Sequence, residues 1–125
     1  MAYTTIDDPT DYFNTLLYTG DGTSSRSITG VGFQPDWIWI KGRNQARNNT
    51  LYDSQTNALS SFDSDGFSVG DNTGVNENTT TYVSWNWLAG GTASSNSNGS
   101  ITSSVSVNTT AGFSIVSYTG TGSTA

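Results

Sequence analysis

The sequence predicts an all-β protein built as an antiparallel β-sandwich of the jelly-roll or lectin-like kind. Apolar and polar residues alternate with a period of two along most of the chain, as side chains do on the two faces of a strand. β-branched and aromatic residues collect in short runs, which Gly, Pro, Asn and Asp separate. Many short strands joined by such turns are typical of sandwiches and barrels.

Eight of these runs predict strands, and helix is expected only as a short turn near Pro9. In chain order the predicted strands span residues 12–19, 25–31, 37–41, 50–53, 66–69, 80–88, 100–107 and 112–119. Turn signals separate several of them, at residues 20–22, 34–36, 63–66 and 71–74.

Composition narrows the class of protein further. Ser, Thr, Asn and Gly make up 65 of the 125 residues, but 12% aromatic residues provide enough bulk for one core. The chain has no Cys and no His, so it lacks disulfides, thiolate metal ligands and the commonest general base. With a net charge of -6 and no long apolar run, nucleic acid and membranes are poor partners. No cofactor is expected.

The ends of the chain differ in character from its middle. Residues 1–11 lack the basic and apolar regions of a secretory signal and are interpreted as an N-terminal arm. Residues 12–91 hold the sandwich, and residues 92–99, which contain no side chain larger than Asn, are predicted to be a polar linker. The remaining stretch is 100–125.

That last stretch echoes the beginning of the chain. Residues 112–123 repeat the pattern of residues 12–23, with Phe, Tyr and Gly at matching positions. Either residues 100–125 begin a second, similar module, or one sandwich uses two similar strands as its returning strands.

Tryptophans are the principal candidate binding residues. Alternation places Trp37 and Trp39 on one face of a strand, and Trp85 and Trp87 on one face of another. Exposed indoles can stack on the apolar face of a sugar ring, whereas buried indoles would supply core area. In the carbohydrate-binding interpretation, Asp36, Asp53 and Asn86 supply the polar contacts.

The acidic residues give two weaker signals. Asp63, Asp65, Asp71 and Asn72 resemble part of a calcium loop, although a hairpin turn with Gly66 at a positive φ is the simpler explanation. No pair of carboxyl groups stands out as an acid and a base, and we expect no enzymatic activity. Three cations cluster after residue 40, at Lys41, Arg43 and Arg47.

The blocks at residues 32–43, 51–54, 61–70 and 81–91 resemble a repeated domain family in structural proteins of marine tailed bacteriophages. The resemblance covers about residues 12–91. It implies a lectin-like sandwich in a multi-module virion protein, such as a tail fibre, without catalysis or cofactor. Members carry a longer polar segment where this chain has only residues 55–58.

From this resemblance we expect a structural virion protein, assembled in the host bacterial cytoplasm and displayed for host attachment. The arm would anchor it through Tyr3 and Ile6 to other phage virion proteins, and open sheet edges favour a trimer or larger symmetric array as its oligomer. Host-surface glycans are the expected ligands. The alternatives are a capsid decoration or head-fibre protein and a free carbohydrate-binding module.

Overall fold

The computed structural model describes residues 6–46, 50–51 and 58–122, and it confirms the predicted all-β, sandwich-like fold. The helical segments are η1 (Pro9–Asp11) and α1 (Thr73–Asn76). The strands are β1 (Phe13–Thr19), β2 (Arg26–Thr29), β3 (Trp37–Gly42), β4 (Thr50–Leu51), β5 (Leu59–Asp63), β6 (Gly66–Val69), β7 (Thr81–Trp87), β8 (Ser94–Asn96), β9 (Ser103–Asn108) and β10 (Phe113–Tyr118).

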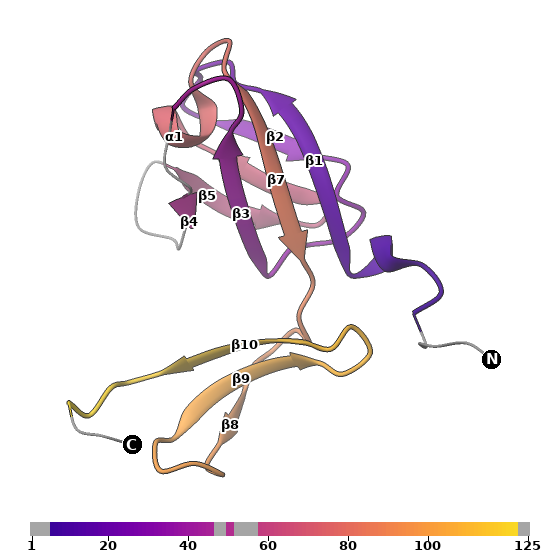
Figure 1. Ribbon diagram of the computed structural model, residues 1–125, viewed down its shortest axis with the longest axis vertical. Helices are drawn as coiled ribbons and strands as arrows, with labels where there is room; N and C mark the ends of the chain where they lie inside the picture. Colours follow the sequence, from indigo (N-terminus) through magenta and orange to yellow (C-terminus); the bar gives the residue numbers. More distant parts are fainter. Residues whose placement is uncertain (1–5, 47–49, 52–57, 123–125) are drawn as a thin grey trace.

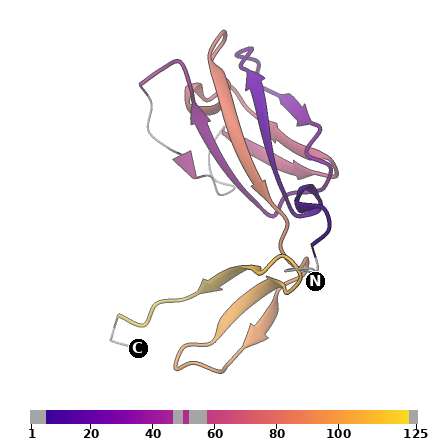
Figure 2. The ribbon, with the colours of Figure 1, turned by 45° about the vertical axis from the view of Figure 1, so that its right-hand side comes forward.

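The strands form three antiparallel sheets. A four-stranded sheet, in the order β1-β7-β3-β4, packs against a three-stranded sheet in the order β2-β6-β5 (Figure 1). The third sheet, β10-β9-β8, projects from one end of this sandwich, as the rotated view in Figure 2 also shows. Neither helical segment of the described residues has the length or apolarity to span a bilayer.

The core lies between the first two sheets. Strand alternation sends Ile38, Ile40 and Tyr82 inward from the four-stranded sheet, where they meet Phe67 and Val69 of the facing sheet. All five side chains are buried. These side chains form one core layer between the two sheets.

Two tyrosines of the four-stranded sheet also hold the segment around α1. The ring of Tyr18 stacks on that of Tyr82, with 5.2 Å between centroids. The Tyr18 hydroxyl donates to the Val75 carbonyl and the Tyr82 hydroxyl to the Thr73 carbonyl, both at 2.8 Å. The turn predicted at residues 71–74 is therefore the start of a one-turn helix, with Asn72 as its cap.

The predicted hairpin turn at residues 63–66 is confirmed, and it joins β5 to β6. Gly66 has a φ of 149°, and a Cβ there would collide with the carbonyl oxygen of Ile28. Only glycine allows this approach of β6 to β2. Strand β5 itself was not predicted, because Ser60 and Ser61 interrupt its apolar alternation and a register shift lies between residues 59 and 61.

The linker prediction for residues 92–99 is wrong in its centre. Residues 94–96 form β8 and pair with β9, because strand pairing uses backbone groups and does not need large side chains. The Ser106 hydroxyl of β9 accepts from the Gly90 amide and donates to the Gly91 carbonyl. These two hydrogen bonds attach the third sheet to the segment that follows β7.

The buried core predicts a large difference between two apolar substitutions. Phe67→Ala should lower the free energy of unfolding by about 3–5 kcal/mol, because it leaves a cavity under a fully buried ring. Leu17→Ala, at a β1 side chain that is 64% exposed, should change it by no more than about 0.5 kcal/mol. Urea unfolding measures both, and equal losses would contradict the assigned core.

Candidate functional site

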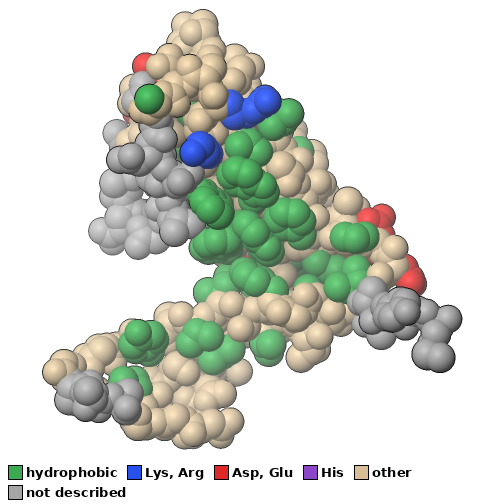
Figure 3. Space-filling model, in the orientation of Figure 1, with side chains coloured by type: hydrophobic (Ala, Val, Ile, Leu, Met, Phe, Trp, Pro, Cys, Tyr) green, Lys and Arg blue, Asp and Glu red, His purple; other side chains and the backbone are tan. Residues whose placement is uncertain are grey.

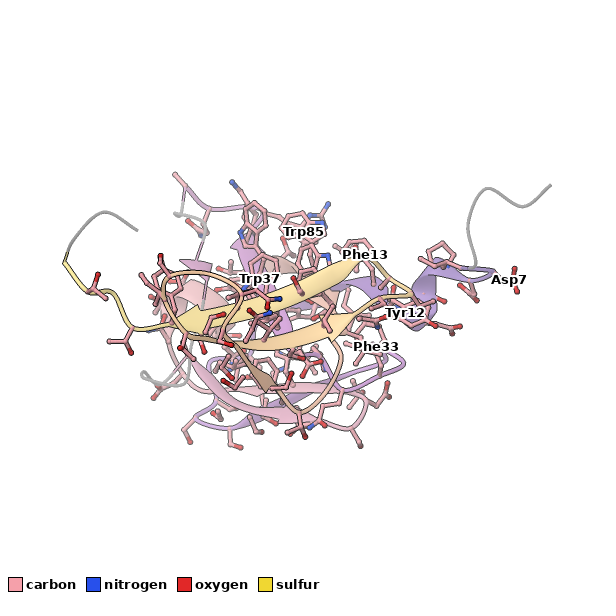
Figure 4. All side chains as sticks on the ribbon, turned by 90° about the horizontal axis from the view of Figure 1, so that it is seen from below. Asp7, Tyr12, Phe13, Phe33, Trp37 and Trp85 are labelled. Carbon is pink, nitrogen blue, oxygen red and sulfur yellow. The ribbon has the colours of Figure 1, made fainter. Side chains whose placement is uncertain are left out.

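The four tryptophans lie together on the outer face of the four-stranded sheet. Trp39 of β3 lies opposite Trp85 of β7, and Trp37 lies opposite Trp87. Figure 4, seen from the third sheet, shows Trp37, Trp85 and Phe13 on the same side of the sheet. The side chains on the other side of these strands form the core, so the indoles face away from it.

These rings pack against one another instead of in the core. Ring centroids are 4.4 Å apart for Trp37–Trp87, 5.2 Å for Trp39–Trp85 and 4.9 Å for Phe13–Trp87. Each pair is tilted by about 50°, and all four indoles are half-buried. The interpretation of the indoles as buried core residues is wrong, because the sandwich encloses only the opposite face. We call these four indoles and Phe13 the aromatic face.

The third sheet covers one end of the aromatic face. Phe113 of β10 lies 6.3 Å from Trp37 and 6.2 Å from Trp87, between ring centroids. Next to it, Trp37, Phe113, Ser114 and Ile115 line a hollow of about 240 Å³. The aromatic face therefore has an end packed against β10 and an end, at Trp39 and Trp85, farther along the strands.

Basic side chains adjoin this farther end. Lys41 follows Trp39 by two residues on β3, so it shares the outer face, and it pairs in register with Val83. Figure 3 shows apolar side chains gathered over this face of the molecule with basic ones at their upper edge. The farther end of the aromatic face therefore has a cation, Lys41, beside it.

Of the polar residues predicted to accompany the indoles, the two that the structure describes have structural hydrogen bonds instead. Asp36 accepts from the Ala89 amide at 2.8 Å, and its own amide donates to the Trp87 carbonyl, so it fixes the ends of β3 and β7. Asn86 was wrongly assigned to the site: it is fully buried on the core face, where its amide nitrogen donates to the Asn14 carbonyl at 3.0 Å. Asp53 lies outside the described residues.

The residues of the candidate calcium loop do not converge. Asp65 accepts from the backbone amides of Gly30 and Gly32, at 3.2 and 2.7 Å, and so fixes a loop. Asn72 caps α1, and Asp71 is exposed. In residues 6–46, 50–51 and 58–122, no three acidic side chains come together as metal ligands would.

Asp63 has a separate environment on the outer side of β5. Its carboxylate accepts from the hydroxyls of Ser68 and Ser61, both at 2.7 Å, and from Ser27 at 3.4 Å. The bonds from Ser68, then Ser61, hold the pKa of Asp63 below its ordinary value, against a small opposing effect of desolvation. These bonds link β2, β5 and β6 across their polar face.

The N-terminal arm is only partly described. Ile6 is half-buried and lines a hollow of about 300 Å³ together with Tyr12, Phe13 and Phe113. This apolar anchor candidate therefore lies beside the aromatic face of its own chain. Tyr3, the other anchor candidate, lies outside the described residues.

Sequence reasoning missed two aromatic residues of this site, Phe13 and Phe113. Both occupy the same position in the two echoing segments, and both pack on Trp87. Alternation along residues 13–19 places Phe13 on the face opposite Leu16 and Tyr18. This pattern is the signal from which the outward position of Phe13 could be predicted.

The fold and the site define an all-β, sandwich-like module that carries an aromatic outer face. The chain belongs to the family described as a domain of unknown function, DUF7483, whose model matches residues 8–58 and 54–125. Among curated proteins and among solved structures, nothing matches the chain.

The low pKa of Asp63 predicts an acid-dependent contribution to stability. A lowered pKa in the folded state stabilises the protein above the ordinary value of 3.8, and this contribution disappears as the pH falls through the folded-state value. The difference in free energy of unfolding between wild type and Asp63→Asn should thus be largest at neutral pH and shrink below about pH 4. Asp71→Asn, at an exposed site, is the control for net charge; a difference for Asp63→Asn that does not vary with pH would contradict the assignment.

Proposed function

We propose that this chain is a non-enzymatic structural module of a tailed-phage virion, and that its aromatic face contacts glycans of the host surface. The observation that carries the glycan contact is the gathering of four half-buried indoles on one outer face of the sandwich. The virion assignment is supported by the resemblance of the residue blocks between positions 32 and 91 to phage structural proteins.

The end of the aromatic face away from β10 is the part suited to a sugar. Trp39 and Trp85 are half-buried there, with their ring centroids 5.2 Å apart, and a pyranose has an apolar face that an indole can match. Lys41 on the same face adds a cation that would favour a carboxylate or sulfate on the glycan. An anionic surface polysaccharide is the ligand class that meets both features.

Three acidic residues of the module have structural partners, which supports binding without catalysis for these three. Asp36 and Asp65 accept hydrogen bonds from backbone amides, and Asp63 accepts from three serine hydroxyls. Each carboxylate thereby stabilises a loop or a sheet. The proposal assigns no reaction to any of them.

Assembly into a trimer or larger symmetric array is part of the proposal. Strand β1 is at the edge of its sheet, with β7 on one side only. Edge strands present backbone groups that a neighbouring chain can pair with. Attachment through residues 1–11 would leave most of the aromatic face free to bind a ligand. The exception is the part at Phe13, because Ile6 of the arm lies beside it.

A free carbohydrate-binding module is the second candidate, because the same aromatic face would serve it without a particle. A capsid decoration or head-fibre protein is the alternative within the virion. The location of the chain distinguishes the three.

Titration with host-surface polysaccharides tests the glycan contact. An anionic polysaccharide should change the tryptophan emission, and Trp85→Ala should weaken binding by about tenfold or more, equivalent to 1.4 kcal/mol. Phe62→Ala, an exposed aromatic on the other sheet, is the matched control and should bind like wild type. If Trp85→Ala stays folded by near-UV circular dichroism and binds normally, the aromatic face is not the glycan site.

Immunogold labelling of purified virions tests the location. Label on the tail or its fibres is expected, and a variant that lacks residues 1–11 should keep the sandwich fold but be lost from particles. Label over the head would indicate a capsid decoration protein. Absence from particles would leave the free carbohydrate-binding module.

A further inference from the structure

We infer that β10 is built as the first strand of a second sandwich of this kind, and that its solvent-facing side docks the remainder of that sandwich. The occupant is a further module of the same family, connected through the loop that follows β10. This inference concerns the third sheet and does not depend on the location of the chain or on glycan binding.

Strands β1 and β10 have the same pattern of side chains. Residues 13–19 read Phe-Asn-Thr-Leu-Leu-Tyr-Thr and residues 113–119 read Phe-Ser-Ile-Val-Ser-Tyr-Thr. In β1, Leu16 and Tyr18 point inward and pack on the sandwich core. Their counterparts in β10 are Val116 and Tyr118.

In β10 this inward side has no core to pack on. Val116 is 52% exposed and Tyr118 is 68% exposed, whereas Leu16 and Tyr18 are half-buried. Beside them, Ile101, Val116 and Tyr118 line a largely apolar hollow of about 350 Å³. Strand β10 therefore has the side-chain pattern of β1, but the side that packs on a core in β1 is open to solvent in β10.

The other side of β10 already has its contacts. Phe13 of β1 packs on Trp87 from the outer face, and Phe113 of β10 packs on Trp37 and Trp87 of the same sandwich. Phe113 thus occupies the outward position of a β1-type strand. Strand β10 is also at the end of its sheet, so one edge is available for a β7-type strand, as β1 has β7.

One glycine gives an independent argument for the nature of the partner. After β1, a Cβ at Gly20 would collide with the Glu77 carbonyl. After β10, Gly120 follows at the same position, yet no described atom lies within 4 Å of a Cβ placed on it. Gly22 and Gly122 both have a positive φ, which explains glycine at those two positions without a partner. Gly120 therefore fits the connection between α1 and β7 of a sandwich, although that connection is not beside it.

A second copy of this chain fits the surface less well. In the first sandwich the Tyr18 ring stacks on Tyr82, and its hydroxyl donates to the Val75 carbonyl. Two β10 faces placed together would cover the tyrosine rings but offer no equivalent of this carbonyl. The remainder of a sandwich provides both a ring that stacks on the tyrosine and a carbonyl that accepts from its hydroxyl.

The first test asks whether β10 can act as β1. The substitutions Asn14→Ser, Thr15→Ile, Leu16→Val and Leu17→Ser convert the β1 sequence into that of β10. This variant should still unfold in one cooperative transition in urea, at a lower midpoint because Leu16→Val removes buried volume. The matched control exchanges two residues, with Leu16→Ser and Leu17→Val, and should lose the transition since its apolar residue faces outward.

The second test supplies the missing partner. In a fusion protein, residues 20–91 are repeated after Thr119, so that β10 precedes a copy of everything that follows β1 in the sandwich. The repeat should fold, which would give about twice the change in tryptophan emission on unfolding and a protease-resistant second module.

Single substitutions locate the contact in this fusion. Tyr118→Asp should leave the original chain unchanged, because the side chain is exposed, but should make the repeat in the fusion sensitive to protease. Ser117→Asp, on the opposite side of β10, should leave both proteins folded.

Three outcomes would overturn the inference. They are loss of folding in the β10-type variant of β1, a repeat that stays unfolded while the first sandwich is intact, and sedimentation of the original chain as a dimer that shields Tyr118. The last outcome would assign the surface to a second copy of the chain.

Discussion

The alternation of side chains along β3 and β7 is the constraint on which the rest of the structure depends. The run Trp37–Ile40 is apolar at every position, so this strand presents an apolar side chain to both faces of its sheet. The isoleucines meet Phe67 and Val69 between the sheets, and the indoles are left outside. A sheet that is apolar on both faces needs cover on both. Among the described residues, the β2-β6-β5 sheet covers one face, and the third sheet covers only one end of the other.

The rings of the aromatic face partly cover one another and so reduce the apolar surface left on the outer side of the sheet. Aromatic pairs at these separations contribute about 0.5–1.5 kcal/mol each beyond the area they bury. Three such pairs join the rings into two groups, Phe13–Trp87–Trp37 and Trp39–Trp85. Phe113 of β10 packs on the end of the aromatic face that is nearest the third sheet, and this contact attaches the third sheet to the sandwich. The same rings therefore stabilise the sheet and pack against Phe113 of β10, and in the proposed function the part of the face at Trp39 and Trp85 contacts the ligand.

The sequence predicted the elements with strong alternation and missed those determined by tertiary contacts. The strands of the four-stranded sheet follow from period-two patterns. Strands β5 and β8 each contain two adjacent serines that give no apolar alternation, and they pair with the backbones of β6 and β9. Alternation predicts that Trp37 and Trp39 share one face of a strand and that Trp85 and Trp87 share one face of another. The pairing of β3 with β7, which brings the four indoles together, has no local signal in the sequence. Asn86 was misplaced although alternation puts it opposite Trp85 and Trp87, and the serines around Asp63 come from three strands whose register no local pattern determines.

The third sheet connects the two proposals. This sheet has Val107, Val116 and Tyr118 exposed on one face. Phe113 on the aromatic face, together with Ser106 and Asn108 on the connection from β7, attaches it to the sandwich. If β10 begins a further sandwich, Phe113 lies at the junction and sets the distance from one aromatic face to the next. Successive faces at a fixed spacing would bind a repetitive polysaccharide together, and the effective concentration of the second site would convert weak single contacts into strong attachment. An aromatic face that is partly covered by packing could still bind the polysaccharide in such an array, because no single module would have to bind tightly.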